Sequence, residues 1–128
     1  MAAFNSPFLN PIDYEMAKEA VLRSFTSDVI SGVSPQDQAV MPTAPGDNLK
    51  VVLRSVKAVS SIACIVLLED DIATALTKFS VIPGAPHLEE NIFIPAANNK
   101  FIRADVTGTT TDLIITGTYV IIPSTTTY

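Results

Sequence analysis

The stretch FIRADVTGTTTDLIITGTYVIIP, residues 101–123, decides the fold class. It consists of two runs in which apolar and polar residues alternate, joined by VTGTTTD. Alternation with a period of two is typical of a β-strand with one buried face, and a Gly-bearing loop between two such runs predicts a β-hairpin. Gly117, inside the second run, predicts a bulge or a close backbone approach. Few side chains in this stretch are suited to acid–base or nucleophilic chemistry.

Similar runs precede this stretch at short intervals. In the first of them, Leu49, Val51 and Leu53 share one face of a strand, with Lys50 and Arg54 on the other. The run SIACIVLLE (61–69) is apolar on both faces, which predicts a central strand covered on both sides. Further strands are expected over 77–83, 91–95 and 100–106, the second near a sheet edge. Without helices between them, these strands predict an all-β antiparallel sandwich or barrel.

The N-terminal residues predict an arm followed by one short helix. Pro7 favours an extended backbone in residues 1–10, whose apolar side chains follow no period. This arm either packs on its own domain or reaches a neighbouring subunit. Asn10, Pro11 and Asp13 form a helix-start pattern, which predicts a helix from Pro11 to about Ala20. We therefore expect an arm over 1–10, a single β-sandwich domain over 11–123 and a tail over 124–128.

Between this helix and the alternating runs, the sequence is less regular. Residues 21–30 either extend the helix or form a strand, and their aromatic and β-branched residues favour a strand. Residues 31–48 are expected to form a long loop with a turn at Pro45–Asn48. Val40 and Met41, in the middle of this loop, indicate that it packs against another surface.

Composition excludes several classes of protein. The 128 residues suffice for one domain with a core of its own, and no apolar run is long enough to span a membrane. No signal peptide is recognisable at the N-terminus, so we expect synthesis in a reducing cytoplasm. The net charge of -5 argues against binding to nucleic acid. The single cysteine, Cys64, excludes an internal disulfide.

Candidate chemical residues are few. His87 is interpreted as an exposed loop histidine and Cys64 as a buried core cysteine. The run Glu69-Asp70-Asp71 is interpreted as a solvated turn, with binding of a hard cation such as Ca²⁺ as the alternative. Nucleophile, metalloprotease and phosphate-loop motifs are absent from the sequence. We therefore predict no catalytic residue, no metal site and no cofactor, and an enzyme is the least favoured class.

The sequence resembles one protein family. The run Lys100–Arg103, followed by Val106–Thr109 and a Thr-rich strand, is similar to the C-terminal hairpin of the cement (decoration) proteins that coat the capsids of short-tailed bacteriophages. Phe25–Ile30, a Gly/Pro loop, Leu49–Leu53 and a strand ending in acidic residues occur in the same order as in that family. The resemblance covers about residues 24–122, outside the arm and the helix signal. It implies a jelly-roll fold and an oligomer on the outside of an HK97-type capsid.

The resemblance also implies partners. We expect contacts to the major capsid protein and to other copies of this chain in a homodimer or homotrimer on the virion surface, and none to nucleic acid or membrane. Internal packing is the alternative for each expected contact residue. The expected residues are Phe4, Phe8, Leu9, Val40, Met41 and Tyr128. A tail or collar component and a small-ligand-binding or carbohydrate-binding β-sandwich are the alternative functions.

Overall fold

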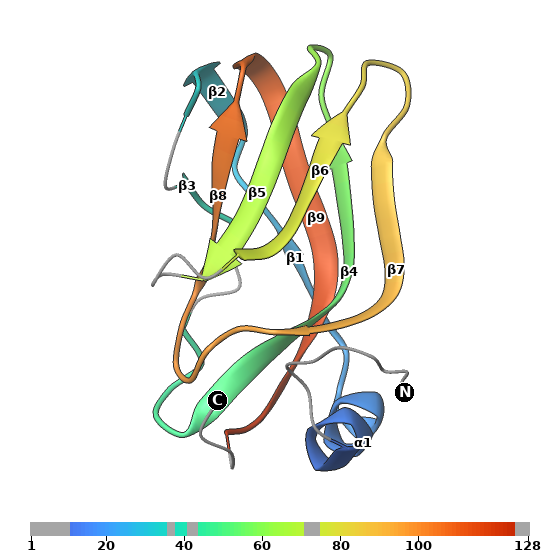
Figure 1. The fold of residues 1–128 in the computed structure, drawn as a ribbon, viewed down its shortest axis with the longest axis vertical. Helices are drawn as coiled ribbons and strands as arrows, with labels where there is room; N and C mark the ends of the chain where they lie inside the picture. The colour runs from blue at the N-terminus through green and yellow to red at the C-terminus, as the bar shows by residue number, and fades with distance from the viewer. Residues whose placement is uncertain (1–10, 36–37, 41–43, 71–74, 125–128) are drawn as a thin grey trace.

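The computed structural model of the protein describes residues 11–35, 38–40, 44–70 and 75–124. They form two antiparallel sheets packed face to face, with one short helix, α1 (Pro11–Glu19), at the bottom of the sandwich (Figure 1). The first sheet contains β1 (Arg23–Thr26), β2 (Ile30–Val33), β9 (Thr109–Pro123), β4 (Leu49–Val59) and β7 (His87–Pro95). The second contains β3 (Gln38–Ala39), β8 (Ile102–Thr107), β5 (Cys64–Asp70) and β6 (Ala75–Val81). The predicted all-β sandwich is confirmed.

The two alternating runs in residues 101–123 are both strands, but the predicted hairpin is wrong. β8 pairs with β5 and β3 in one sheet, whereas β9 pairs with β4, β1 and β2 in the other. The chain crosses between the sheets at Gly108, whose φ of 112° lies outside the range that L side chains favour. A Gly-bearing loop is compatible with both connections, because local sequence defines the strands and not their partners.

The edge of the first sheet is a strand interrupted once. β1 and β2 both pair with β9, one after the other, and Ser27 lies at the break between them. The Ser27 backbone N–H donates to the carbonyl oxygen of Ile115 at 2.8 Å, and its buried hydroxyl accepts from the Ile115 N–H at 2.9 Å. The hydroxyl thereby continues the ladder across the break. The prediction of strand in residues 21–30 is confirmed, and the predicted loop 31–48 also contains β2 and β3.

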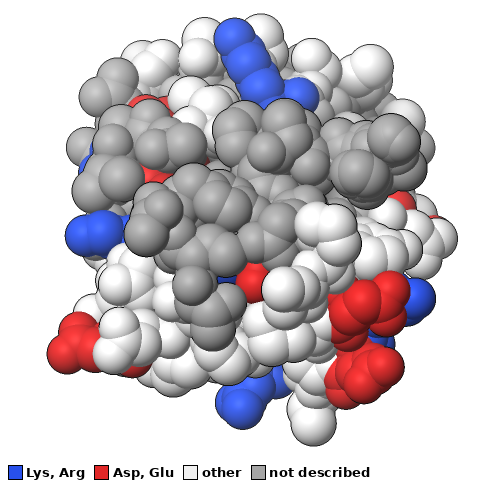
Figure 2. Space-filling model, turned by 60° about the horizontal axis from the view of Figure 1, so that its bottom comes forward, with Lys and Arg blue, Asp and Glu red and all other residues white. Residues whose placement is uncertain are grey.

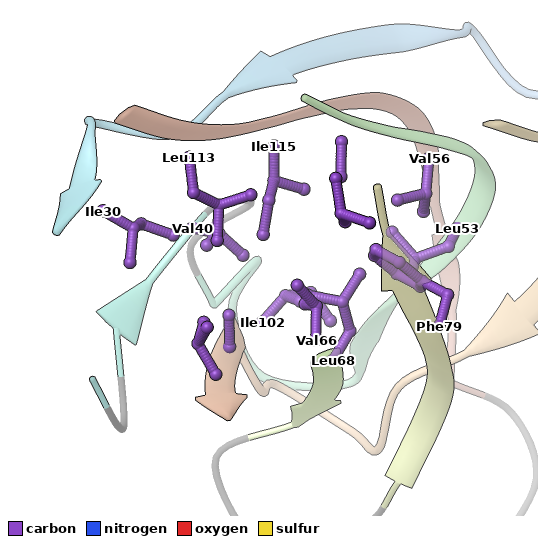
Figure 3. Close-up of a cluster of buried hydrophobic side chains, with 14 of the residues drawn as sticks. Ile30, Val40, Leu53, Val56, Val66, Leu68, Phe79, Ile102, Leu113 and Ile115 are labelled. Atoms are coloured by element: carbon purple, nitrogen blue, oxygen red, sulfur yellow. The ribbon is translucent and has the colours of Figure 1, made fainter. Parts of the chain in front are cut away.

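The core lies between the sheets and follows the predicted period of two. Val51 and Leu53 are fully buried on the inner face of β4, and Ile102 and Ala104 of β8 are buried in the same core. Figure 3 shows this packing, with Leu113 and Ile115 of the first sheet above Val66, Leu68 and Ile102 of the second. These aliphatic and aromatic side chains supply most of the folding free energy, at about 25 cal/mol for each Å² of apolar surface buried.

One strand differs from the prediction. β5 is an interior strand of its sheet, between β8 and β6, and its inner face is buried. Its outer face is not covered as expected, because Ile65 is 39% exposed and Leu67 is half-buried. Apolar runs on both faces predicted a covering layer, yet α1 lies against the other sheet, beside β9.

Gly117 marks a close approach, as predicted. It pairs with Phe25 of β1 on one side and Val56 of β4 on the other. A Cβ at this position would overlap the carbonyl oxygen of Ser55 and lie 2.8 Å from the Phe25 ring. Next to it, the register of β4 shifts between Leu53 and Ser55, so the bulge is on the partner strand. Only glycine fits between these neighbours.

Candidate interaction surfaces

The lower end of the sandwich holds both ends of the described chain. This lower end comprises α1, residues 44–48 and the end of β9. α1 packs on the outer face of the first sheet, where Ala17 joins a buried cluster with Ile122. The backbone N–H of Ser124 donates to the carbonyl oxygen of Asn48 at 2.7 Å. Segments that precede residue 11 or follow residue 124 therefore join the sandwich at one end.

A buried ion pair fixes α1 to the sheet. The Lys50 Nζ donates to Oδ2 of Asp13 at 2.7 Å, and the two side chains are 1% and 0% exposed. Sequence reasoning missed this pair, because it placed Lys50 on a polar outer face of β4. That face also carries Val52, which is buried with Ala17 where the helix covers it. Removing one partner of such a pair takes an opposite charge away from the other buried group, at a cost of about 3–5 kcal/mol.

Arg54 adds a second connection between α1 and the sheet. Its Nε donates to the carbonyl oxygen of Ile92 at 3.1 Å, and its Nη1 donates to the carbonyl oxygen of Ala17 at 3.4 Å. The guanidinium carbon lies 4.0 Å from the centre of the Phe93 ring, in a cation–π contact. A cation near the last turn of a helix also suits its dipole. The arginine thus joins α1, β4 and β7.

The acidic turn is not solvated, so that interpretation is wrong for the two residues that lie within the described part of the chain. Glu69 is 4% exposed and Asp70 is 1% exposed. The Arg103 Nε donates to Oε1 of Glu69 at 3.3 Å, and the Ala97 backbone N–H donates to Oδ2 of Asp70 at 3.2 Å. Burial raises the pKa of Glu69, the neighbouring Asp105 raises it further, and Arg103 opposes both effects. Asp71 lies outside the described residues.

His87 is not an exposed loop residue, so this interpretation is also wrong. It is the first residue of β7, half-buried, and its ring stacks on Phe79 with centroids 4.1 Å apart and planes at 1°. Its Nε2 lies 3.1 Å from Oε2 of Glu89, which is the distance of an ion pair when the imidazole is protonated. Within the described structure, Nε2 makes no hydrogen bond. The Thr77 hydroxyl donates to the same carboxylate at 3.1 Å. These side chains connect the edge strands β6 and β7.

Cys64 is a buried core cysteine, as predicted. Its side chain is 6% exposed in the core between the sheets. Burial raises the pKa of its thiol, and a hydrogen bond with Ser60 partly opposes this shift. A thiol that is buried and has a raised pKa is a poor nucleophile.

The predicted contact residues fall into two groups. Val40 is fully buried in the core between the sheets, and its backbone N–H donates to the carbonyl oxygen of Ile102 at 3.1 Å. Because the Val40 side chain is buried in the core, the prediction that it contacts a partner is wrong. The alternative, internal packing, is correct for this residue. The other predicted contact residues lie outside the described part of the chain. They are Phe4, Phe8, Leu9, Met41 and Tyr128.

The upper end of the sandwich, which we call the crown, consists of four loops and the strand ends that flank them. They cover residues 31–35, 59–63, 82–86 and 107–112. The Ser34 backbone N–H donates to the Gly108 carbonyl oxygen at 2.9 Å, and the Ser61 N–H donates to Oδ1 of Asp112 at 2.9 Å. These bonds join three loops, and the fourth closes β6 to β7 beside them (Figure 1).

The crown is almost free of charge. Asp112 is the one Asp, Glu, Lys or Arg in its four loops, and the hydrogen bonds from Ser61 lower the pKa of this carboxyl. The remaining polar side chains are Ser and Thr hydroxyls. Large apolar side chains are exposed among them, at 81% for Val33, 59% for Ile82 and 45% for Val59. The four segments therefore carry one exposed carboxylate, several hydroxyls and single exposed apolar side chains.

The lower end differs from the crown in its charges. Figure 2 views the molecule from the bottom, where both basic and acidic side chains lie around the described surface. Across residues 11–35, 38–40, 44–70 and 75–124, no group of three or more His, Cys, Asp or Glu side chains could hold a metal ion. In the same part of the chain, no helix is long and apolar enough to cross a membrane.

Comparison of the chain with protein-family models, with curated proteins and with solved structures gives no significant match. The likeness to cement proteins therefore rests on the short motifs of residues 24–122.

Proposed function

We propose that the chain is a structural protein of a virion, which binds the outside of an HK97-fold phage capsid and stabilises it. The observation that carries this proposal is the anchoring of both described chain ends at one end of a β-sandwich. A cement protein needs no catalytic group. It needs a stiff scaffold and peripheral segments that can reach neighbours.

The strand order supports the jelly-roll fold that the resemblance implies. When β1 and β2 are counted as one interrupted strand, the sandwich has two four-stranded sheets, ordered β1/β2-β9-β4-β7 and β3-β8-β5-β6. From β2 onward the chain changes sheets at every connection except β5 to β6. Eight antiparallel strands wrapped in this way are typical of a jelly roll.

The lower end has the anchorage that a peripheral arm requires. Residues 1–10 lead directly into α1, and α1 is held to β4 by the Asp13–Lys50 ion pair and to Arg54 through its Ala17 carbonyl. β4 is flanked by β9 and β7, so the anchor is in the interior of the sheet. We expect Phe4, Phe8 and Leu9 of the arm, with Met41 and Tyr128, to contact the capsid or neighbouring copies. When copies are linked, weak contacts multiply into strong attachment.

Deletion of residues 1–10 tests the proposal. The shortened chain is expected to keep its thermal unfolding midpoint, because the sandwich core is formed by later residues, and to co-sediment less with undecorated HK97-fold capsids of short-tailed phages. A second variant keeps the full length but replaces the apolar side chains of the arm, with Phe4→Ser, Phe8→Ser and Leu9→Ser. It should weaken binding similarly, which would assign the effect to these side chains. A shortened chain that does not fold would place the arm in the core and contradict the proposal. Closed rings of the free protein in mass photometry would instead favour a tail or collar component.

A further inference from the structure

The outer face of the second sheet carries apolar side chains on an interior strand. β5 lies between β8 and β6, and its Cys64, Val66 and Leu68 are buried in the core. Ile65 and Leu67 alternate with them and therefore face outward, where Ile65 is 39% exposed and Leu67 is half-buried. In the described part of the chain, the one helix lies against the other sheet. Apolar residues on both faces of an interior strand are typical of a sheet that is covered on both sides.

Cross-strand neighbours join these two residues into one patch. Residues that pair across a sheet share a face, with Cα atoms about 5 Å apart. Phe79 of β6 and Val106 of β8 are buried in the core, so the residues on either side of them along each strand face outward. The outer patch consists of two rows across β8, β5 and β6, which are Thr107, Ile65 and Ser80 in the first row and Asp105, Leu67 and Lys78 in the second.

The charges of the outer patch are self-complementary. Lys78 and Asp105 lie on opposite sides of Leu67, each about one strand spacing away. A two-fold axis that lies between two facing copies and runs along β5 exchanges the two sides of this strand. It therefore places Lys78 of each copy opposite Asp105 of the other. We propose that the protein forms a homodimer in which two outer patches pack face to face about this axis. The inference is independent of capsid binding.

The same axis matches the remaining residues of the patch. Ile65 and Leu67 meet their own counterparts, so apolar surface leaves water at the centre of the interface. The hydroxyls of Ser80 and Thr107 meet across the first row. Sheets that pack face to face lie about 10 Å apart with their strands within about 30° of each other, which an axis near the direction of β5 provides.

The arrangement of charges favours a second copy over another partner. A partner surface of one sign would attract one end of the second row and repel the other, whereas a second copy attracts both. The next residues on this face, Glu69 and Arg103, already bond to each other at 3.3 Å and leave the interface electrostatically neutral there. The patch is small beside stable interfaces, which bury about 800 Å² per partner, so the dimer is expected to dissociate in the micromolar range.

Sedimentation velocity of the full-length chain over a series of concentrations measures the dimer. Ile65→Asp places two carboxylates against each other at the centre of the interface and should weaken dimerisation about tenfold or more. The matched control is Val59→Asp on the first sheet, at a position that is 45% exposed against 39% for Ile65. It should stay within about twofold of the unmodified chain. Thermal unfolding checks that each variant is folded, and Ile65→Thr replaces Ile65→Asp if it is not.

An exchange of charges tests the symmetry of the dimer. Lys78→Glu and Asp105→Lys should each weaken dimerisation, because each places like charges across the axis. An equimolar mixture of these two variants should associate about as well as the unmodified chain, because both contacts of the mixed dimer pair opposite charges. Asp105 also interacts with Glu69 of its own copy. If Asp105→Lys is not folded, the Lys78→Glu dimer is measured with increasing salt, which should strengthen it by screening the repulsion while weakening the unmodified dimer.

Several outcomes would overturn the inference. They are an unmodified chain that stays monomeric at every concentration, equal losses in Ile65→Asp and Val59→Asp, and a mixture of the two charge variants that associates no better than either alone. If Asp105→Lys is not folded, salt that weakens the Lys78→Glu dimer as it weakens the unmodified one would overturn the inference in the same way. None of these results bears on capsid binding, which co-sedimentation measures separately.

Discussion

The two ends of the sandwich contain different buried polar groups. The buried charged side chains, Asp13, Lys50, Glu69 and Asp70, lie at the lower end or at the ends of strands that run towards it. Towards the crown, the buried polar side chains are hydroxyls, those of Ser60 and Thr110. Ser60 donates to the carbonyl oxygen of Ile62 at 2.7 Å, and Thr110 donates to the carbonyl oxygen of Ile30 at 2.9 Å.

This difference concerns where the charged side chains lie in the sandwich. The buried Asp13–Lys50 ion pair joins α1 to β4, and separating the two charges would be costly. The crown loops contain one exposed carboxylate, that of Asp112, and no Lys or Arg. The two ends of the sandwich therefore differ in their buried groups: the lower end holds a buried ion pair, and the buried polar side chains towards the crown are hydroxyls.

The largest expected effect comes from breaking the ion pair at the lower end. Lys50→Met leaves the Asp13 carboxylate buried, and we expect the free energy of unfolding to fall by about 3–5 kcal/mol. Urea unfolding measures this loss, with the exposed Lys57→Met on the same strand as the matched control at about 0.5 kcal/mol or less. Adding Asp13→Leu to Lys50→Met should recover most of the loss. If Lys50→Met and Lys57→Met lowered the free energy of unfolding equally, the ion pair would not be what fixes the helix.

A smaller effect is expected at the crown, where the backbone rather than a charge is constrained. Gly108→Ala places a side chain at φ 112°, although its Cβ would meet Ala63 O at an ordinary 3.5 Å. We expect a loss of about 2 kcal/mol from this backbone conformation. Gly84→Ala is the control, with φ 79° and no atom within 4 Å, and should lose about 1 kcal/mol. Chemical unfolding that ranks the two in the opposite order would contradict the account of the sheet crossing.

The smallest effect is a pH dependence due to Glu69. The pKa of Glu69 in the folded state is raised above its ordinary value near 4.5 by burial and by Asp105. The folded state therefore holds this proton more tightly than the unfolded state, and stability falls as pH rises from about 4.5 through the raised pKa. Glu69→Gln should remove this part of the slope in urea unfolding measured across pH. The exposed Glu90→Gln should keep it, and an identical slope in the two variants would contradict the assignment.

Much of the fold was predictable from sequence, because most strands have one buried face. Alternation located β4, β6 and β8, and it identified their inner faces, for example Phe79 and Val81 against Lys78 and Ser80. The helix-start pattern at Pro11 located α1. These are local signals, since strand and helix periods are properties of neighbouring residues.

The errors concern contacts between residues far apart in the sequence. Nothing beside Lys50 indicates that Asp13, 37 positions earlier, will cover it. The acidic pair at the end of β5 looks like a solvated turn until Arg103 and the Ala97 N–H supply its partners. In the same way, the loop around Gly108 does not reveal that the chain changes sheets there. The crown was also missed, because its four loops come together only in the folded sandwich.

Hydrogen–deuterium exchange on the full-length protein, free and bound to undecorated HK97-fold capsids, tests the contrast between the two ends most directly. Binding is expected to slow exchange in residues 1–10, which lead into α1 at the lower end, and to leave the four crown segments unchanged. Exchange in α1 should change little, because Lys50 already anchors this helix to the sheet. Protection confined to the crown segments, with residues 1–10 unchanged, would contradict the proposed attachment through the lower end.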